Sequence, residues 1–287
     1  MEKRKIALLG FGSAGRYLAQ KIAETPLLET AFLWNRSPER FAGTTLSDQQ
    51  PCYHTISPVE ALNDYANAHG VPDLVAEMCH PAIVRDYGTA LLNKTSLFVS
   101  SLTALAHLPT EEHLRIAAQQ HALFLPSGAA WGIQDILKMN RLGTIRDLRV
   151  TMRFHAAALK LASPLRETLD AYVQDTAHTA PCTLYEGPVR PLAALAPNNV
   201  NTMTCVALAG SMAGLDRTTA VLQADKQHHA HETTIEVWGP GDFYVKTVRH
   251  NPARPGAVTG NETYASFWAS LLTAVERAPF AHGIQFC

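Results

Sequence analysis

The sequence predicts an α/β protein in which a Rossmann-type, doubly wound parallel sheet is joined to a second, α+β domain. Near the start, a short apolar run ends in a glycine-rich turn, and an apolar-periodic segment follows at once. Apolar strands then alternate with helical segments as far as Pro126. Beyond Pro126 the alternation gives way to longer strands and a hairpin pattern, so a second domain is expected there.

The composition is that of a globular protein without a strong charge. The chain has 287 residues, 47% of them hydrophobic, and a formal net charge of −1. This balance attracts neither nucleic acid nor an anionic membrane surface, and no apolar run is long enough to cross a bilayer. The five cysteines are widely spaced and form no CxxC pair, which is typical of reduced thiols and predicts a cytoplasmic protein.

The glycine-rich turn, GFGSAG, has the strand–turn–helix context of a dinucleotide-binding fingerprint. Gly10 permits the tight turn, Gly12 lets a pyrophosphate approach the backbone, and Gly15 lets the helix pack closely on the strand. The N–H groups at the start of the helix, at Ser13 and Ala14, would face the phosphates. We therefore expect these five residues to bind a dinucleotide. The alternative is a strand-to-helix turn with no ligand.

The end of the second strand, expected over residues 30–35, bears on which nucleotide binds. In NAD-binding proteins an acidic residue usually follows this strand and binds the ribose hydroxyls. Here Asn35 is followed by Arg36, which can pair with a 2′-phosphate, and by Ser37, which can donate a hydrogen bond to it. Asn35 and Arg36 are therefore expected at a cofactor site that accepts NADP or NAD. The alternative is that Arg36 is a solvated loop residue.

The rest of the first domain follows the same alternation. Ser57 is the expected N-cap of a helix that has Pro58 in its first turn. Since ligands bind beyond the carboxyl ends of parallel strands, Cys79, His80 and Ser100 are expected to flank the nicotinamide. His80 can equally be a helix-capping residue. Strands are predicted over residues 73–78, 96–100 and 122–126, and helices over 57–69, 81–92 and 110–121.

The second domain is predicted from strands of a different pattern. Residues 156–180 carry little pattern and are interpreted as a lid or interface segment. Asn198 and Asn201 stand at the start of an apolar helix, where they are either capping residues or amides that bind a ligand. Strands are expected over residues 145–155, 183–188 and 218–224, helices over 202–213 and 263–276, and a hairpin over 231–249.

The best candidate for proton transfer lies in the segment HHAHE, residues 228–232. In a strand, His231 shares one face with Ile235 and Val237, which are expected to be buried, so its imidazole points inward. Glu232 then faces the opposite side. No metal site is expected, because no Asp or Cys lies at a familiar ligand spacing from these histidines. The alternative for His231 is a structural histidine.

Seven segments, in order over almost the full length, resemble one family. They are GFGSAG, LWNRSPER, PSGAAWGIQDI, LYEGPVR, PNNVNT, ADKQHHAHE and NPARPGAVTG. In these segments the chain is similar to the L-aspartate dehydrogenase family, which includes the vertebrate aspartate dehydrogenase domain-containing proteins. The resemblance implies reversible oxidative deamination of L-aspartate to oxaloacetate and ammonia through iminoaspartate, with NADP or NAD as cofactor. It also implies a homodimer.

The resemblance further implies roles for single residues. His231 falls on the family's catalytic histidine, and Ala129 and Asn201 fall on positions that contact the nicotinamide. Asn198 and Asn199 are expected at the substrate, although many members have lysine at the position of Asn198. By the same resemblance, residues 1–126 and a C-terminal helical segment, 255–287, form the dinucleotide-binding domain. Residues 127–254 then form the substrate, catalytic and dimerisation domain.

Two questions stay open at this point. The two substrate carboxylates need donors, and the sequence does not choose among the candidates Arg153, Lys160, Arg166 and Arg190. Asp225 or Glu232 is the candidate for orienting the imidazole of His231. The two-domain build also fits a dehydrogenase or reductase of another oxo, imino or hydroxy acid, or a sensor that binds the cofactor without turnover.

Overall fold

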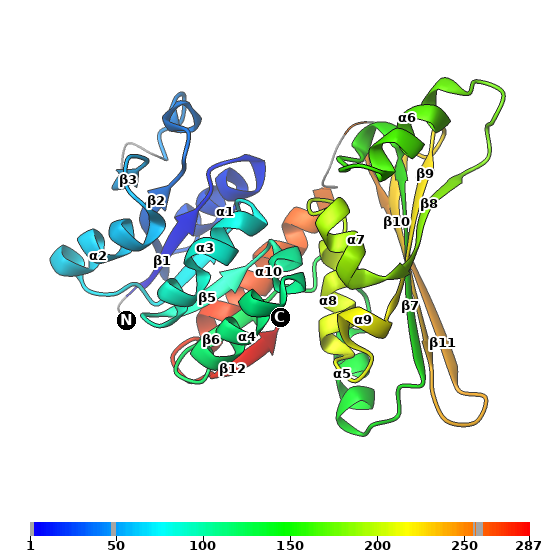
Figure 1. Cartoon of the computed structure of the whole chain (residues 1–287). Helices are drawn as coiled ribbons and strands as arrows, with labels where there is room; N and C mark the ends of the chain where they lie inside the picture. Colours follow the sequence, from blue (N-terminus) through cyan, green and yellow to red (C-terminus); the bar gives the residue numbers. More distant parts are fainter. Residues whose placement is uncertain (1–2, 47–49, 255, 257–260) are drawn as a thin grey trace. The chain divides into compact units, whose positions relative to one another are not determined.

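The computed structural model describes residues 3–46, 50–254, 256 and 261–287 (Figure 1). The chain divides into two compact units. The first comprises the residues up to Pro126 together with Phe267–Gln285 and Cys287, and the second comprises Ser127–Ser266 with Phe286. Of the segment NPARPGAVTG, residues 255 and 257–260 lie outside the described part of the chain.

The first unit is built on a seven-stranded sheet in the order β12-β6-β5-β4-β1-β2-β3. From β1 the chain winds to β2 and β3 on one side and through β4, β5 and β6 on the other, and these neighbours pair in parallel. The predicted doubly wound parallel sheet is therefore confirmed. The strands are β1 (Arg4–Leu9), β2 (Leu28–Trp34), β3 (Cys52–Tyr53), β4 (Leu74–Glu77), β5 (Ser96–Val99), β6 (Ala122–Leu125) and β12 (Gly283–Phe286).

The helices of the first unit begin close to where the sequence predicts them. α2 has the expected cap: the Ser57 hydroxyl accepts from Glu60 N, and the Glu60 carboxylate accepts from Ser57 N. The core includes Leu8, Phe98 and Phe124, which are fully buried. The elements are α1 (Ser13–Ala23), η1 (Pro38–Phe41), α2 (Pro58–His69), α3 (Pro81–Leu92), η2 (Leu102–Ala106) and α4 (Leu108–Ala117), which ends short of the predicted residue 121.

The C-terminal helix α10 (Asn261–Arg277) enters the first unit part-way along its length. Leu271, Ala274 and Val275 pack into the same core as β1 and β5. The edge strand β12, which the sequence analysis did not predict, neighbours β6. The chain thus returns to the first unit at Phe267.

The second unit contains a five-stranded mixed sheet in the order β11-β10-β7-β9-β8. β10 is antiparallel to both β11 and β7, and its register with β11 runs from Ala230 opposite Pro252 to Trp238 opposite Tyr244. The predicted hairpin and the predicted α+β class are therefore confirmed. The strands are β7 (Asp147–His155), β8 (Cys182–Pro188), β9 (Thr219–Asp225), β10 (Ala230–Trp238) and β11 (Tyr244–Pro252).

Helices cover one face of this second sheet, and the other face is open within the unit (Figure 1). The central helix, α8 (Asn201–Ala209), is buried from Thr202 to Ala209 and ends short of the predicted residue 213. Within residues 156–180, where the sequence showed little pattern, α6 (Leu165–Gln174) forms and buries Leu165, Leu169 and Tyr172, while the interpretation as a lid or interface segment stays a prediction. Also unpredicted are α5 (Ile133–Arg141), α7 (Val189–Leu195), α9 (Gly214–Arg217) and the short turn η3 (Ala156–Ala158).

The five cysteines are all free thiols. Burial raises the pKa of Cys79, Cys182 and Cys287, the last to about 12, so these side chains are poor nucleophiles near neutral pH. Cys205 is fully buried in α8. No helix in the described ranges has the length and apolar character that crossing a membrane requires.

Candidate functional site

The glycine turn between β1 and α1 has the geometry that a dinucleotide-binding turn needs. Gly10 has φ = 103°, and a Cβ there would lie 2.7 Å from Cys79 Sγ. A Cβ on Gly15 would lie 1.9 Å from Gly10 O, so only glycine lets α1 approach β1 this closely. A Cβ on Gly12 would meet nothing within 4 Å. The backbone at Gly12 is therefore open to a ligand.

The N-terminus of α1 offers its first-turn N–H groups at this opening. Gly12 is the N-cap, no side chain caps the helix, and the first turn carries no acidic residue. Ser13 is exposed and Ala14 is half-buried. The unpaired N–H groups and the positive end of the helix dipole favour an anion here. The turn thus fits a dinucleotide pyrophosphate, which Gly12, Ser13 and Ala14 would hold through their backbone.

Asn35 connects this turn to the loop after β2. Its Oδ1 accepts a hydrogen bond from Phe11 N at 3.0 Å, and its Nδ2 donates to Ser37 O at 2.9 Å. The side chain therefore shapes both segments without adding a negative charge. Arg36 is exposed beside it. The arrangement leaves a cation accessible at the point where an acidic residue would otherwise repel a 2′-phosphate.

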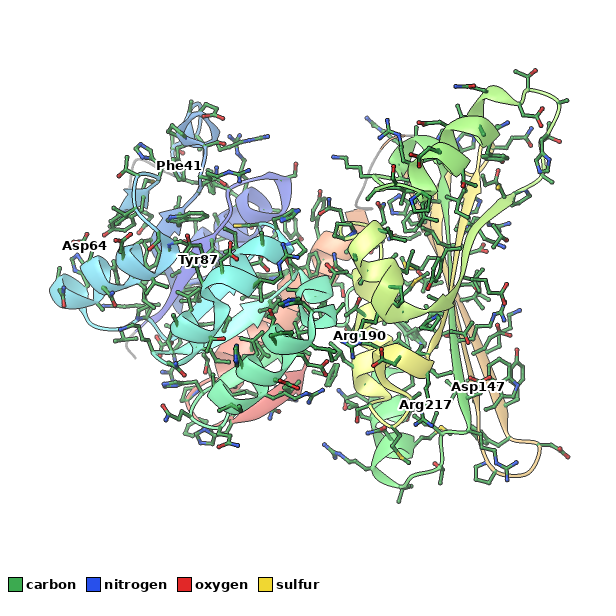
Figure 2. All side chains as sticks on the ribbon, viewed as in Figure 1. Phe41, Asp64, Tyr87, Asp147, Arg190 and Arg217 are labelled. Carbon is green, nitrogen blue, oxygen red and sulfur yellow. The ribbon has the colours of Figure 1, made fainter. Side chains whose placement is uncertain are left out.

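Arg16, which directly follows the glycine turn, was missed by the sequence analysis. Arg16 on α1 lies over the Phe11 ring, 5.4 Å from its centroid, and donates a hydrogen bond to Arg40 O. Phe41, labelled in Figure 2, also packs on Phe11, with ring centroids 5.5 Å apart. These contacts hold η1 against the glycine turn. The position of Arg16 directly after GFGSAG is the sequence feature that could have indicated these contacts.

Glu77, the last residue of β4, is the other residue that the sequence analysis missed. It is 1% exposed. Its Oε1 accepts hydrogen bonds from Cys79 N at 2.6 Å, His80 N at 2.9 Å and Ser101 Oγ at 2.9 Å, and its Oε2 accepts from Ser101 N at 3.1 Å. Burial raises the pKa of Glu77, and the four donors oppose that shift. An acidic residue inside the otherwise apolar segment LVAEM is the sequence feature that could have indicated a role for Glu77.

Glu77 brings the loops after β4 and β5 together, and with them three of the predicted cofactor residues. Ser100 N donates to Glu77 O at 3.1 Å, beside the side-chain bonds to Cys79 and His80. His80 is the N-cap of α3, with its Nδ1 accepting from Ala82 N at 3.2 Å, so the capping alternative is confirmed. Burial and the charges of Arg85 and Arg36 lower the pKa of His80. His80 is thus a neutral helix cap at the carboxyl end of the sheet.

In the second unit, His231 lies on the buried face of β10 as predicted. His231 is 7% exposed, Ile235 2% and Val237 5%, whereas the alternate residues from Glu232 to Trp238 are half-buried. The His231 ring packs against Phe154 of β7 with centroids 4.9 Å apart and planes at 61°. The imidazole is therefore held by packing on the helix-covered side of the sheet.

Glu232 and Asp225 are the two candidates for orienting the imidazole of His231. Glu232 points to the opposite face, where it forms an ion pair with Arg153 at 2.8 Å. Asp225 ends β9 and accepts from Gln227 N at 2.8 Å, which stabilises a turn. Opposite His231 across the β10–β11 ladder is Asn251, which is 2% exposed. Its Nδ2 donates to Thr263 Oγ1 at 3.3 Å, and its buried Oδ1 has no hydrogen-bond partner among the described residues.

Ala129 and Asn201 lie in neighbouring segments of the second unit. Ala129 is 9% exposed and follows Gly128, whose carbonyl accepts from Arg249 at 2.9 Å and from Ser266 at 2.8 Å. A Cβ on Gly128 would lie 4.0 Å from Thr202 Oγ1, beside Asn201 at the start of α8. The fold therefore brings these two predicted nicotinamide contacts close to each other.

The asparagines before α8 are not helix caps. Val200 is the N-cap of α8 and no side chain caps it, so the capping interpretation of Asn198 and Asn201 was wrong. Asn199 is 4% exposed; its Oδ1 accepts from Lys160 N at 2.9 Å and its Nδ2 donates to Ala158 O at 3.1 Å. Asn199 thus fixes the loop that carries Lys160. Its burial disfavours the direct substrate contact expected for it, which stays a prediction.

Three of the four candidate carboxylate donors already pair with an acid. Arg153 pairs with Glu232, Arg166 with Asp170 at 3.1 Å, and Arg190 (labelled in Figure 2) with Asp216 at 2.7 Å. Lys160 is exposed, and within the described ranges no ion pair of its ammonium is found. Lys160 is therefore the candidate whose charge is most available to a substrate carboxylate.

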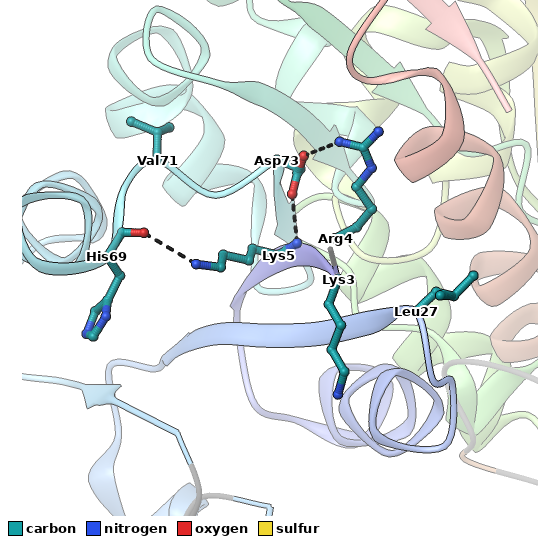
Figure 3. Close-up of a pocket in the computed structure, with 7 residues that line it drawn as sticks. All are labelled: Lys3, Arg4, Lys5, Leu27, His69, Val71 and Asp73. Atoms are coloured by element: carbon teal, nitrogen blue, oxygen red, sulfur yellow. Dashed lines mark hydrogen bonds and ion pairs between the residues drawn. The ribbon is translucent and has the colours of Figure 1, made fainter. Parts of the chain in front are cut away.

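Two pockets among the described residues include neither the glycine turn nor His231. One, of about 580 Å³, is at the amino end of the first sheet and is lined by Lys3, Arg4, Lys5, Leu27, His69, Val71 and Asp73 (Figure 3). Its cations are largely engaged, since Arg4 pairs with Asp73 at 2.8 Å and Lys5 Nζ donates to His69 O at 3.4 Å. The other, of about 330 Å³, lies beside α6 and includes His155, Arg166 and Lys226.

Comparison with known proteins shows which family this chain is similar to. The family model described as "Aspartate dehydrogenase, C-terminal" matches residues 135–270. An aspartate dehydrogenase domain-containing protein of Xenopus tropicalis is 39% identical over 94% of this chain and 94% of its own. An L-aspartate dehydrogenase of Acinetobacter baumannii is 24% identical over 82% of this chain and 84% of its own. Aspartate dehydrogenase of Thermotoga maritima, a crystal structure, has a TM-score of 0.65 at 15% identity and covers 96% of this chain and 97% of that one.

The sheet order and the open glycine turn define a two-unit protein whose first unit has a Rossmann-type fold. The Xenopus relative is 39% identical and covers 94% of this chain, and the family model matches residues 135–270. The chain belongs to the aspartate dehydrogenase family.

Proposed function

We propose that this protein is an NAD(P)-dependent L-aspartate dehydrogenase, which converts L-aspartate reversibly to oxaloacetate and ammonia through iminoaspartate. The open backbone at Gly12 carries the proposal, because it gives a dinucleotide a place to bind in a chain of this family. The substrate is proposed from the relatives named L-aspartate dehydrogenase. A nicotinamide nucleotide supplies a hydride acceptor when it is bound.

The first unit binds the nucleotide in this proposal. The backbone from Gly10 to Gly15 holds the pyrophosphate, and Asn35 and Arg36 contact the adenosine ribose or its 2′-phosphate. Cys79, His80 and Ser100, which Glu77 ties together, border the nicotinamide with backbone groups and a neutral imidazole. The family resemblance also implies nicotinamide contacts for Ala129 and Asn201.

The second unit supplies the groups that act on the substrate. His231 activates the water that adds to the imine, since a neutral imidazole is a suitable base near neutral pH. Asn251, directly across the strand pair, offers an amide oxygen beside it for a substrate ammonium or that water. Lys160 holds a substrate carboxylate from the loop that Asn199 fixes.

A direct assay tests the proposed reaction. Purified protein is mixed with oxaloacetate, ammonium and either NADH or NADPH, and absorbance of the reduced nucleotide is followed. We expect nucleotide consumption that requires both oxaloacetate and ammonium, with L-aspartate as the product. A second candidate substrate class is another oxo, imino or hydroxy acid, because Asn198 departs from the lysine that the family resemblance implies at this position. Turnover of such an acid without turnover of oxaloacetate would replace L-aspartate as the substrate.

Replacing Arg36 by alanine tests the cofactor site. Arg36 is exposed beside a neutral Asn35, so it is expected to pair with a 2′-phosphate. We expect the Arg36→Ala variant to raise the Michaelis constant for NADP(H) by about 10–100-fold, the size of one charge-assisted contact, and that for NAD(H) far less. Arg85→Ala, which also removes a charge near His80, is the control. Equal changes for both nucleotides would remove Arg36 from the phosphate site.

Replacing Lys160 by alanine tests the substrate contact. A lost charge-assisted bond to a carboxylate is expected to raise the Michaelis constant for L-aspartate about tenfold or more. The Michaelis constant for the nucleotide should hardly change. Arg190→Ala is the matched control, because Arg190 is already neutralised by Asp216. If both variants have the same Michaelis constant for L-aspartate as the wild type, another residue binds the carboxylates.

The proposed assembly is a homodimer, as the family resemblance implies. Closed two-fold symmetry is the commonest arrangement of soluble homo-oligomers. Light scattering after size exclusion at micromolar concentration is expected to report about twice the chain mass of 31.3 kDa. A mass of one chain would contradict the proposal.

A further inference from the structure

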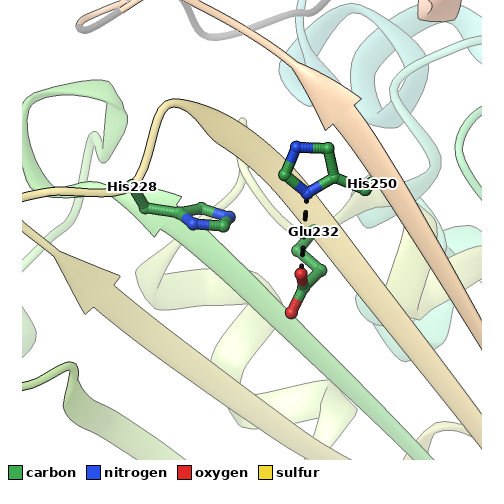
Figure 4. Close-up of side chains that lie close together, drawn as sticks. All are labelled: His228, Glu232 and His250. Atoms are coloured by element: carbon green, nitrogen blue, oxygen red, sulfur yellow. Dashed lines mark ion pairs between the residues drawn. The ribbon is translucent and has the colours of Figure 1, made fainter.

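Three side chains that could hold a metal ion gather on the open face of the second sheet (Figure 4). His228 lies in the turn before β10, Glu232 lies on β10, and His250 lies on β11. Their possible ligand atoms lie within 4.8 Å of one another, and His250 Nδ1 is 3.7 Å from Glu232 Oε2. Glu232 and His250 are direct neighbours in the β10–β11 register. The hairpin therefore creates a cluster that the spacing along the chain does not reveal.

We propose that His228, Glu232 and His250 form a binding site for a divalent transition-metal ion of the zinc class. Two imidazoles and one carboxylate are a donor set that zinc accepts, and a fourth position is left for water. Ligand atoms of a tetrahedral zinc ion lie about 3.3–3.6 Å apart, given bonds of about 2.0–2.2 Å. The side chain of His250 is 59% exposed on the edge strand, so a ring rotation can close the remaining gap.

A second observation points to a ligand at this place. His228 Nε2 is buried and has no hydrogen-bond partner among the described residues. The ring of His228 points toward the other two side chains (Figure 4), and its centroid is 5.8 Å from that of His250. A buried nitrogen without a partner is costly, and a metal ion at the cluster would satisfy it.

Arg153 influences the affinity of this site for a metal ion. It donates to Glu232 Oε1 at 2.8 Å, which fixes the carboxylate and leaves Oε2 facing His250. Its positive charge also opposes a cation nearby. We therefore expect an affinity in the micromolar range, well below that of a structural zinc site.

The metal site is distinct from the proposed catalytic imidazole. Because side chains alternate along a strand, Glu232 faces away from the side that buries His231. The ion would join the turn before β10 to β11. It would thus fasten the strand that carries His231, without touching the substrate.

Metal titration of the full chain, with no affinity tag and after treatment with a chelator, tests the proposal. Calorimetry near neutral pH is expected to show one Zn²⁺ bound per chain, and Co²⁺ is expected to give the visible absorption of four-coordinate cobalt. His250→Ala and Glu232→Gln are each expected to weaken Zn²⁺ binding at least tenfold. His229→Ala is the matched control, since His229 is exposed and outside the cluster, and it should bind as the wild type does.

The test of the metal site does not depend on the proposed enzymatic activity, because metal binding is measured without substrate or nucleotide. His250 is exposed on an edge strand, so its replacement leaves the fold intact, which thermal unfolding without metal can check. Zn²⁺ should raise the unfolding temperature of the wild type and of His229→Ala, but not that of His250→Ala. Absence of binding to the wild type, or equal weakening by all three variants, would overturn the proposal.

Discussion

Replacing His231 by asparagine is expected to lower the turnover of L-aspartate by roughly 10²–10⁴-fold, the usual effect of losing a general base. Asparagine keeps a polar group of similar reach, so the packing against Phe154 is largely retained. What it lacks is a ring nitrogen that can take a proton from water. Dissociation constants for NADP(H) should hardly change, because the pyrophosphate site proposed here consists of Gly10 to Gly15 in the first unit.

Two measurements separate a catalytic from a structural role for His231. Added imidazole should restore part of the turnover of His231→Asn, since a free base can replace the missing one, and a merely structural defect would not respond. Thr233→Val is the control, because Thr233 is 2% exposed on the same face of β10 and loses only a hydroxyl. If His231→Asn keeps more than about a tenth of wild-type turnover while chemistry limits the rate, His231 is structural.

The buried position of His231 was predictable because a strand has a period of two. Ile235 and Val237 mark the inner face, and the observed exposures of His231 and both residues agree with it. The position of Glu232 on the opposite face follows from the same rule. The hydrogen bonds of Glu77 were not predictable, since its acceptor atoms reach Ser101, 24 residues further along the chain.

The cluster of His228, Glu232 and His250 could not be found from spacing along the chain. The sequence analysis looked for an Asp or Cys at a familiar spacing from the histidines and found none, whereas the hairpin places His250 opposite Glu232. The turn that joins Trp238 to Tyr244 fixes this register, so the pair follows once the exact turn is known. α6 was missed for another reason: Leu165, Leu169 and Tyr172 have helical spacing, but charged residues separate them in a short segment.

Asn35 is a residue whose hydrogen bonds the sequence did not predict. The absence of an acid after β2 suggested a site that accepts NADP or NAD, and that stays a prediction. The amide, however, also bonds to Phe11 N and Ser37 O, and therefore joins the glycine turn to the next loop. A substitution of Asn35 by aspartate would thus change both the charge and the loop, and would not isolate cofactor preference.

Replacing Glu77 by alanine is expected to destabilise the first unit by about 3–5 kcal/mol, because it leaves several buried donors without an acceptor. The carboxylate now receives hydrogen bonds from Cys79 N, His80 N and both polar groups of Ser101. Three of these donors are backbone N–H groups, which cannot turn to another partner without moving the loops after β4 and β5. The free energy of unfolding, measured by urea denaturation, checks this expectation.

A graded series separates the role of Glu77 in stability from its role in nucleotide binding. Glu77→Gln keeps the shape and one acceptor oxygen, but its NH₂ group faces a backbone donor, so we expect a loss of about 1–3 kcal/mol. Asp64→Ala, which removes an exposed acid from the same unit, is the control and should change stability little. At a temperature where Glu77→Gln is folded, its dissociation constant for NADP(H) should rise about tenfold, because Cys79, His80 and Ser100 lose their common anchor. Unchanged nucleotide binding in folded Glu77→Gln would restrict Glu77 to stability and remove these loops from the cofactor site.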